Sequence, residues 1–139
     1  MKKYFTKLDK KKYNWIITGG AGFIGSNLIE RLLKKNQKVI CIDNLFSGSL
    51  DNIRPFLNNK NFKFIKKDIR EKNIIKKKIK IDFFVHLAAL GSVPRSIKDP
   101  YETNDVNLNG SMNMFKLAVQ LKCKRFIFAS SSSVYGEGK

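Results

Sequence analysis

The sequence has no apolar run that approaches 18 residues, and this absence excludes a transmembrane helix. Its N-terminal stretch is basic, but Asp9 and the lysines after it interrupt the stretch before any apolar signal-peptide region, so we expect no signal peptide. Cysteine is also scarce: Cys41 and Cys123 lie far apart in apolar segments, which indicates buried or nearly buried thiols rather than a disulfide. We therefore expect a cytoplasmic protein with no membrane partner.

Acidic residues are few, with 11 Asp and Glu against 28 Lys and Arg, and the net charge of +17 raises the question of a nucleic-acid partner. Lysine outnumbers arginine several-fold, however, whereas phosphate-binding surfaces favour arginine and interleaved aromatic residues. The lysines are spread over expected helix ends and loops, with one dense patch at 72–80. We interpret them as a solvated surface. The alternative is binding to an acidic polymer, which would weaken steeply with salt.

A glycine cluster follows a short apolar run in the stretch Trp15–Gly25. Gly20, Gly22 and Gly25 fit the dinucleotide fingerprint G-x-G-x-x-G, and Gly19, Gly22 and Gly25 fit a looser form of it. The chemistry needs glycine because a pyrophosphate can reach backbone N–H groups at a helix N-terminus only where no Cβ stands in the way. The stretch therefore predicts a buried strand, a phosphate-binding turn and the start of a helix.

Apolar patterns predict alternating strands and helices along one domain at 14–139, after a basic lead-in at 1–13. Expected strands are 14–18, 38–43, 62–65, 81–89 and 125–129. Expected helices begin after the glycines with Phe23 and Ile24 on their apolar side and Asn36 as C-cap, and continue at 71–80 and within 101–121. We expect a short helix or irregular piece at 50–57 and a loop at 91–100. This alternation predicts an α/β fold, a Rossmann-like doubly wound parallel sheet of order 3-2-1-4-5.

An acidic residue stands where the fingerprint requires one. Asp43 ends the second expected strand, about 18 residues after Gly25, where an acid accepts hydrogen bonds from the adenosine ribose. Residues 44–47 contain no arginine for a 2′-phosphate, which favours NAD over NADP. The alternative is an Asp that only begins a turn. His86, at the end of an apolar strand, is interpreted as a packed, hydrogen-bonded side chain rather than an acid or base.

Five segments of this chain resemble the extended short-chain dehydrogenase/reductase family, and within it the NAD-dependent sugar-nucleotide epimerases and dehydratases. They are Thr18–Gly25, Asp43–Asn44, Asp68–Ile69, His86–Ala89 and Ser131–Gly136. The segment 89–100 is similar to 4-epimerases that act on UDP-N-acetylglucosamine or the corresponding uronic acid in surface-polysaccharide synthesis. The resemblance covers the chain from about residue 14 onward.

The resemblance implies roles for particular residues. The catalytic hydroxyl falls on Ser131, with Ser132 as the alternative. The NAD-binding residues would be Gly19, Gly22, Phe23, Ile24, Gly25, Asp43, Asn44, Ser47, Gly48, Asp68, Ile69, Leu87, Ala88 and Ala89. The residues facing a UDP-sugar would be Gly91, Ser92, Val93 and Arg95. No metal is implied, and the full-length form is expected to be a homodimer.

The family's catalytic Tyr-x-x-x-Lys pair lies well beyond that serine, and we expect these 139 residues to lack it, along with the sixth strand and the substrate domain. Tyr135 and Lys139 have the right spacing, but Tyr135 belongs to the Val-Tyr-Gly turn. We therefore expect NAD binding without turnover. The alternatives are a 4,6-dehydratase, a related reductase or decarboxylase, a non-catalytic NAD-binding module and an RNA-binding Rossmann domain. Dehydratases usually carry Asp-Glu where this chain has Ser132-Ser133, which favours an epimerase.

Overall fold

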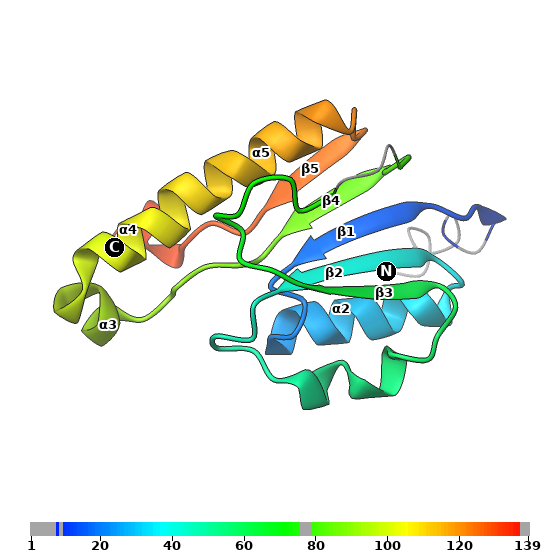
Figure 1. Cartoon of the computed structure of the whole chain (residues 1–139), viewed down its shortest axis with the longest axis horizontal. Helices are drawn as coiled ribbons and strands as arrows, with labels where there is room; N and C mark the ends of the chain where they lie inside the picture. The colour runs from blue at the N-terminus through cyan, green and yellow to red at the C-terminus, as the bar shows by residue number, and fades with distance from the viewer. Residues whose placement is uncertain (1–7, 9, 76–78, 137–139) are drawn as a thin grey trace.

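A five-stranded parallel sheet organises the computed structural model, which describes residues 8, 10–75 and 79–136 (Figure 1). The sheet order is β3-β2-β1-β4-β5, as predicted. The strands are β1 (Asn14–Thr18), β2 (Lys38–Asp43), β3 (Phe62–Lys66), β4 (Phe83–His86) and β5 (Arg125–Phe128). The fourth strand is shorter than the predicted 81–89 at both ends: 81–82 precede it, and residues 87–89 form a loop beyond its carboxyl end.

Helices cover both faces of the sheet at its centre, and the central strand accordingly places Ile16 and Ile17, on opposite faces, in buried positions. Ile16 packs in a core under α5 (Ser111–Gln120), with Met114 and Ala118. Ile17 packs in a second core under α2 (Phe23–Lys34), which lies on the opposite side of the sheet (Figure 1). The strand therefore has no solvent face, and its carboxyl end opens at the edge where the chain turns into α2.

The first two residues of α2, Phe23 and Ile24, face solvent, which corrects the prediction that they pack inward. Their side chains are 82% and 68% exposed. The buried stripe runs instead through Ser26, Ile29 and Leu32. At 100° per residue, Phe23 and Ile24 point more than about 100° away from the middle of this stripe. Asn36 follows the C-cap residue in a left-handed conformation, with φ of 53°, which closes the helix near the predicted point.

The predicted helix at 71–80 is wrong for the residues that the structure describes there, 71–75 and 79–80, none of which is helical. Asn73 has φ of 56°, a left-handed conformation that interrupts a right-handed helix. The inward packing of Ile74, Ile75 and Ile79 is nevertheless confirmed, since all three contact the core under α5. Residues 76–78 lie outside the described residues.

The predicted loop at 91–100 contains one short helix, α3 (Val93–Lys98), and the first residue of a second, α4 (Pro100–Asn104). Each has a proline among its first two residues, Pro94 in α3 and Pro100 in α4, which is favourable because the missing N–H has no partner in the first turn of any helix. Each is capped by a side chain, Ser92 for α3 and Asp99 for α4. The prolines therefore stand in the first turns of helices here. The 50–57 segment forms two 3-10 turns, Leu50–Asn52 and Arg54–Phe56.

The long helix predicted within 101–121 is built from α4, a π-helical stretch Asp105–Gly110, and α5. Several of its apolar residues face solvent: Leu108 is 55%, Met112 58% and Val119 76% exposed. No helix in the described part of the chain is long and apolar enough to span a bilayer.

The side chain of Gln37 holds the residues that precede β1 through hydrogen bonds. Its side chain is 1% exposed, donates to the carbonyl oxygens of Leu8 and Lys11, and accepts from the Tyr13 N–H. Because a buried amide needs partners for its donors and its acceptor, the segment before β1 is tied to the turn between α2 and β2.

Candidate cofactor site

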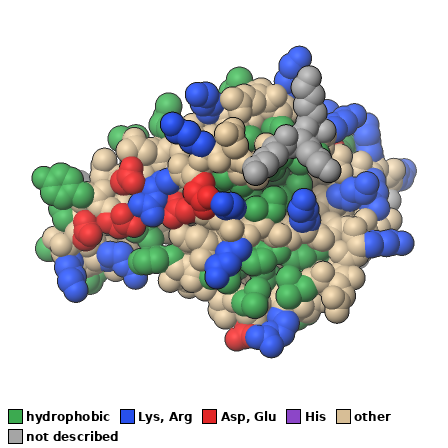
Figure 2. Space-filling model, viewed as in Figure 1, with side chains coloured by type: hydrophobic (Ala, Val, Ile, Leu, Met, Phe, Trp, Pro, Cys, Tyr) green, Lys and Arg blue, Asp and Glu red, His purple; other side chains and the backbone are tan. Residues whose placement is uncertain are grey.

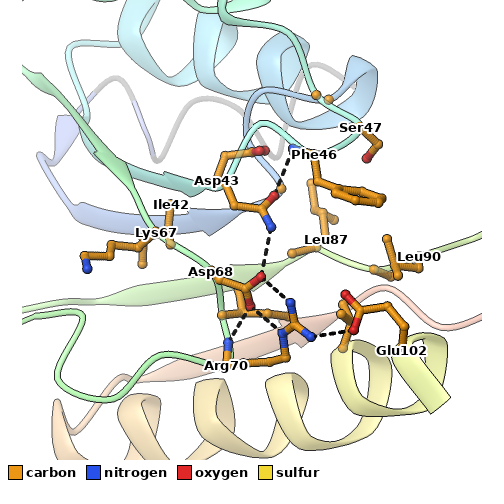
Figure 3. Close-up of a pocket in the computed structure, with 18 residues that line it drawn as sticks. Ile42, Asp43, Phe46, Ser47, Lys67, Asp68, Arg70, Leu87, Leu90 and Glu102 are labelled. Carbon is orange, nitrogen blue, oxygen red and sulfur yellow. Dashed lines mark hydrogen bonds and ion pairs between the residues drawn. The ribbon is translucent and has the colours of Figure 1, made fainter.

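A pocket opens at the carboxyl edge of the sheet, at the switch point between β1 and β4 (Figure 3). This is the place where doubly wound sheets bind ligands. Eleven of the predicted cofactor residues line it: Gly19, Gly22, Asp43, Asn44, Ser47, Gly48, Asp68, Ile69, Leu87, Ala88 and Ala89. Four of the five predicted segments therefore meet at one site.

The glycine turn leaves no room for side chains. Gly19 has φ of 68°, and a Cβ there would stand 2.7 Å from the Ala88 nitrogen. A Cβ on Gly25 would stand 2.4 Å from the Gly19 carbonyl oxygen. Gly22, the N-cap residue of α2, supplies no side-chain cap, and the first turn carries no acid. The first-turn N–H groups of α2 are thus left for an external acceptor, and this arrangement fits a pyrophosphate.

Asp43 is held in place by the backbone around it. It is 8% exposed; one carboxylate oxygen accepts from the Ala21 N–H at 2.9 Å and the other from the Leu45 N–H at 2.8 Å. A carboxylate offers about four acceptor positions, so two remain for ribose hydroxyls. The position fits the predicted ribose acceptor. Through its hydrogen bond from Leu45, Asp43 also orders the turn after β2, which is the function expected under the alternative that this Asp only begins a turn.

One arginine that was not predicted from the sequence, Arg70, lies on the opposite wall of the pocket, surrounded by carboxylates (Figure 3). Arg70 donates to Asp68, to Glu102 at 2.8 Å and to Asp105 at 3.1 Å. The hydrogen bond from Arg70 lowers the pKa of Asp68, and the same carboxylates raise the pKa of the guanidinium. Asn44 also donates to Asp68, at 2.9 Å. The fold thus brings an arginine to a site where the local sequence has none, but three carboxylates compensate its charge.

Phe46 and Lys67 also line the pocket without having been predicted. The Phe46 ring is 58% exposed and carries the Arg95 guanidinium 5.0 Å from its centroid, a cation–π contact. Lys67 forms an ion pair with Glu71. The position of Phe46 just after Asp43 was a local signal that could have identified it.

The residues predicted to face a sugar nucleotide do not line this pocket, nor do Phe23, Ile24, Gly25 and Ser131. Ser92 caps α3, and Val93 is 72% exposed. Ser131 caps the 3-10 turn Ser132–Tyr135, where its hydroxyl oxygen accepts from the Ser133 N–H at 3.1 Å. The structure brings most of the cofactor set together, and the roles of the substrate set and of Ser131 stay predictions.

His86 is packed and hydrogen-bonded, as interpreted from the sequence. It is 1% exposed; its Nδ1 lies 2.5 Å from the Thr18 hydroxyl oxygen and its Nε2 lies 2.9 Å from that of Ser111. Burial lowers its pKa from 6.5 to about 4, because the interior disfavours the charged ring. The imidazole is therefore neutral at physiological pH and has no access to a ligand as an acid or base.

The two cysteines are free thiols, as predicted. Cys41 is fully buried, and burial with the nearby Asp43 carboxylate raises its pKa to about 12. Cys123 is half-buried. Within the described residues no group of three or more His, Cys, Asp or Glu side chains could hold a metal ion.

Charge is unevenly spread over the molecule. On the face shown in Figure 2, acidic side chains gather toward the left, where the strands end, and Lys and Arg dominate the right. The acidic group at the carboxyl edge includes the carboxylates around Arg70. On this face, the acidic side chains therefore gather on the side where the strands end, toward the site.

Comparison with known proteins gives the family. The NAD dependent epimerase/dehydratase family matches residues 15–139. UDP-glucuronic acid decarboxylase 4 from Arabidopsis thaliana is 36% identical over 130 residues, 94% of this chain and 28% of the decarboxylase. A UDP-N-acetylglucosamine 4-epimerase from Methanobrevibacter ruminantium M1, in complex with UDP-N-acetylmuramic acid, is 40% identical with TM-score 0.81, over 92% of this chain and 41% of that structure. A dTDP-glucose 4,6-dehydratase from Streptomyces venezuelae, with NAD and TYD bound, is 30% identical with TM-score 0.82, over 91% and 42%.

The chain thus spans between 28% and 42% of the length of these relatives. NAD is the cofactor that defines the family, and the glycine turn with Asp43 is the part of the fold that suits it. The match over residues 15–139, together with the sheet order and the pocket at its switch point, shows that this chain belongs to the NAD-dependent epimerase/dehydratase family.

Proposed function

We propose that this chain forms the NAD-binding part of a UDP-sugar 4-epimerase, with a UDP-N-acetylhexosamine or the corresponding uronic acid as substrate. The observation that carries the proposal is the pocket in which the glycine turn, Asp43 and Asp68 meet. Similarity to the UDP-N-acetylglucosamine 4-epimerase, the most identical of the three relatives compared above, supports the substrate class. We place the activity in the cytoplasm, in the synthesis of surface polysaccharides.

The cofactor would be held by residues whose geometry is already set. The first-turn N–H groups of α2 would receive the pyrophosphate, and the free acceptor positions of Asp43 the adenosine ribose. Asp68 and Ile69 would flank the adenine, and 87–89 would line the path to the nicotinamide. When bound, NAD supplies a reversible hydride acceptor for C4 of the sugar. Ser131 would then hydrogen-bond the 4-hydroxyl.

Two related reactions are the alternatives. The similarity to a 4,6-dehydratase and to UDP-glucuronic acid decarboxylases keeps both in consideration. Ser132 and Ser133 stand where dehydratases carry Asp-Glu, and this favours the epimerase. Product analysis with UDP-N-acetylglucosamine, UDP-glucuronic acid and dTDP-glucose, on a chain that includes the family's Tyr-x-x-x-Lys pair, separates the three reactions.

We expect residues 1–139 by themselves to bind NAD without turnover. Epimerisation needs a base for the 4-hydroxyl proton, and Tyr135 is 87% exposed in the 3-10 turn beside Ser131. The full-length enzyme is proposed to be a homodimer. The exposed apolar residues Leu108, Met112 and Val119 support an interface on this helical segment.

Calorimetric titration with NAD tests the cofactor site. Asp43→Ala should abolish measurable binding, whereas Asp51→Ala should leave it unchanged, since Asp51 is an exposed acid that pairs only with Arg54 and Ser49 among the described residues. NADP should bind more weakly than NAD, because the wall of the pocket offers its 2′-phosphate no uncompensated arginine. Equal binding of NAD to the unaltered chain and to Asp43→Ala would contradict the assignment.

A further inference from the structure

We propose that His86 is a positioning residue for the NAD site: its neutral ring, protonated on Nε2, links Ser111 to the Thr18 hydroxyl and so fixes the backbone of Ala88. The inference rests on the proposed function, because Ala88 matters only as part of the wall along the cofactor. His86 and Thr18 are directly opposite each other in the pairing of β4 with β1.

The donors and acceptors around the Thr18 hydroxyl indicate which nitrogen of the His86 ring carries the proton. The Thr18 hydroxyl oxygen accepts from the Ala88 N–H at 3.3 Å and from the Leu87 N–H at 3.3 Å, and the Leu87 N–H is shared with the Thr18 carbonyl oxygen at 3.1 Å. A hydroxyl has two acceptor positions and one proton, so that proton is left for the His86 Nδ1 at 2.5 Å. Nδ1 must then be the unprotonated nitrogen. A neutral imidazole has one proton, which lies on Nε2 and is donated to the Ser111 oxygen at 2.9 Å.

The His86 ring is enclosed by aromatic side chains and by two hydroxyl groups. Phe126 and Phe128 from β5 lie 6.0 and 5.7 Å from it, centroid to centroid. The depressed pKa of His86 has burial as its cause. The polar contacts of the ring are the hydroxyls of Thr18 and Ser111, from β1 and α5. The imidazole therefore connects three elements without touching the pocket.

The linked groups end at the cofactor-facing backbone. Ala88 donates its N–H to Thr18, and both Ala88 and the adjacent Gly19 line the pocket. The two segments are so close that a Cβ on Gly19 would stand 2.7 Å from the Ala88 nitrogen. Losing the Thr18 acceptor would leave the Ala88 N–H without its partner at the point where β1 and β4 separate. The position of the glycine turn relative to 87–89 would then be less well defined.

Two variants and their combination test the link. His86→Phe and Thr18→Val should each weaken NAD affinity about tenfold, as expected for one lost buried hydrogen bond. Because both changes break the same connection, the double variant should also lose about tenfold rather than a hundredfold. Thr18→Ser, which keeps the hydroxyl, should bind within about twofold of the unaltered chain. Additive losses, or unchanged affinity in folded Thr18→Val, would overturn the proposal.

Nitrogen-15 NMR of the imidazole tests the tautomer without any substitution, and the chain's single histidine makes the assignment unambiguous. The expected signature is a neutral ring protonated on Nε2, with the Ala88 amide protected from exchange in the unaltered chain. A ring protonated on Nδ1, or a rapid mixture, would overturn the proposal even if the variants did not fold. If the unaltered chain binds no NAD, the proposed function fails. The tautomer and the amide exchange then still decide the hydrogen-bonded link.

Discussion

Lowering the pH should destabilise this protein through a single residue. His86 has a folded-state pKa of about 4 against an ordinary value of 6.5, so the unfolded chain binds a proton between these values and the folded chain does not. Stability contributed by the neutral ring is therefore fully present above about pH 6.5 and is lost as the pH falls toward 4. The sign follows from burial, which penalises the charged ring only in the folded state.

The magnitude can be worked out from these two pKa values. Between pH 7.5 and pH 5 the free energy of unfolding should fall by about 2 kcal/mol, which lowers the melting temperature by about 4–8 °C. Asp68 and Asp82 contribute little to the change in unfolding free energy between pH 7.5 and 5. Their pKa values are lowered from 3.8 in the folded protein, so both carboxylates titrate below this range. With only one histidine in the chain, the slope can be attributed to His86.

Urea unfolding followed by tryptophan fluorescence measures the effect. Trp15 is the only tryptophan, and its ring lies 4.4 Å from that of Phe83, so its emission reports on the packing of β1 against β4. His86→Asn should be less stable overall but should show no slope between pH 7.5 and 5. An unfolding free energy of the unaltered chain that stays constant over this range, or an NMR titration of His86 near 6.5, would refute the reasoning.

Two further predictions each compare a pair of like residues, first two glycines and then two cysteines. Gly25→Ala should weaken NAD binding by at least about tenfold, because a Cβ would stand 2.4 Å from the Gly19 carbonyl oxygen and would displace the phosphate-binding turn. Gly91→Ala, where a Cβ meets nothing within 4 Å, should bind as the unaltered chain does, and calorimetry that found equal losses would contradict this account. In thiol titration at pH 8, the half-buried Cys123, whose pKa is also raised by burial, should react slowly in the folded protein, while Cys41, fully buried and with a pKa of about 12, reacts only after unfolding. Rapid modification of both thiols without denaturant would show that Cys41 is not buried.

Elements with short-range sequence signals could be predicted without the structure. The glycine spacing at 19–25, the acid at Asp43 and the apolar strands are encoded within short windows, because each depends on close approach, strand length or burial on both faces. The right-handed connection between parallel strands then leaves few topologies, and the predicted order was confirmed. Local patterns predicted secondary structure less well where one pattern is compatible with two structures. The prolines at 94 and 100 predict a loop from the sequence, but they lie among the first two residues of α3 and α4.

Contacts between side chains that are distant in the sequence became apparent from the assembled fold. Arg70 reaches Glu102, 32 residues away, and His86 reaches Ser111, 25 residues away, through the alignment of separate elements around the sheet. No spacing rule encodes such contacts, because they depend on strand register and on where each helix crosses the sheet. The glycine turn therefore predicts an NAD site from the sequence. The charge compensation of Arg70 and the hydrogen bonds of His86 arise from the assembled fold, and we propose that they affect what this site accepts and how firmly it is held.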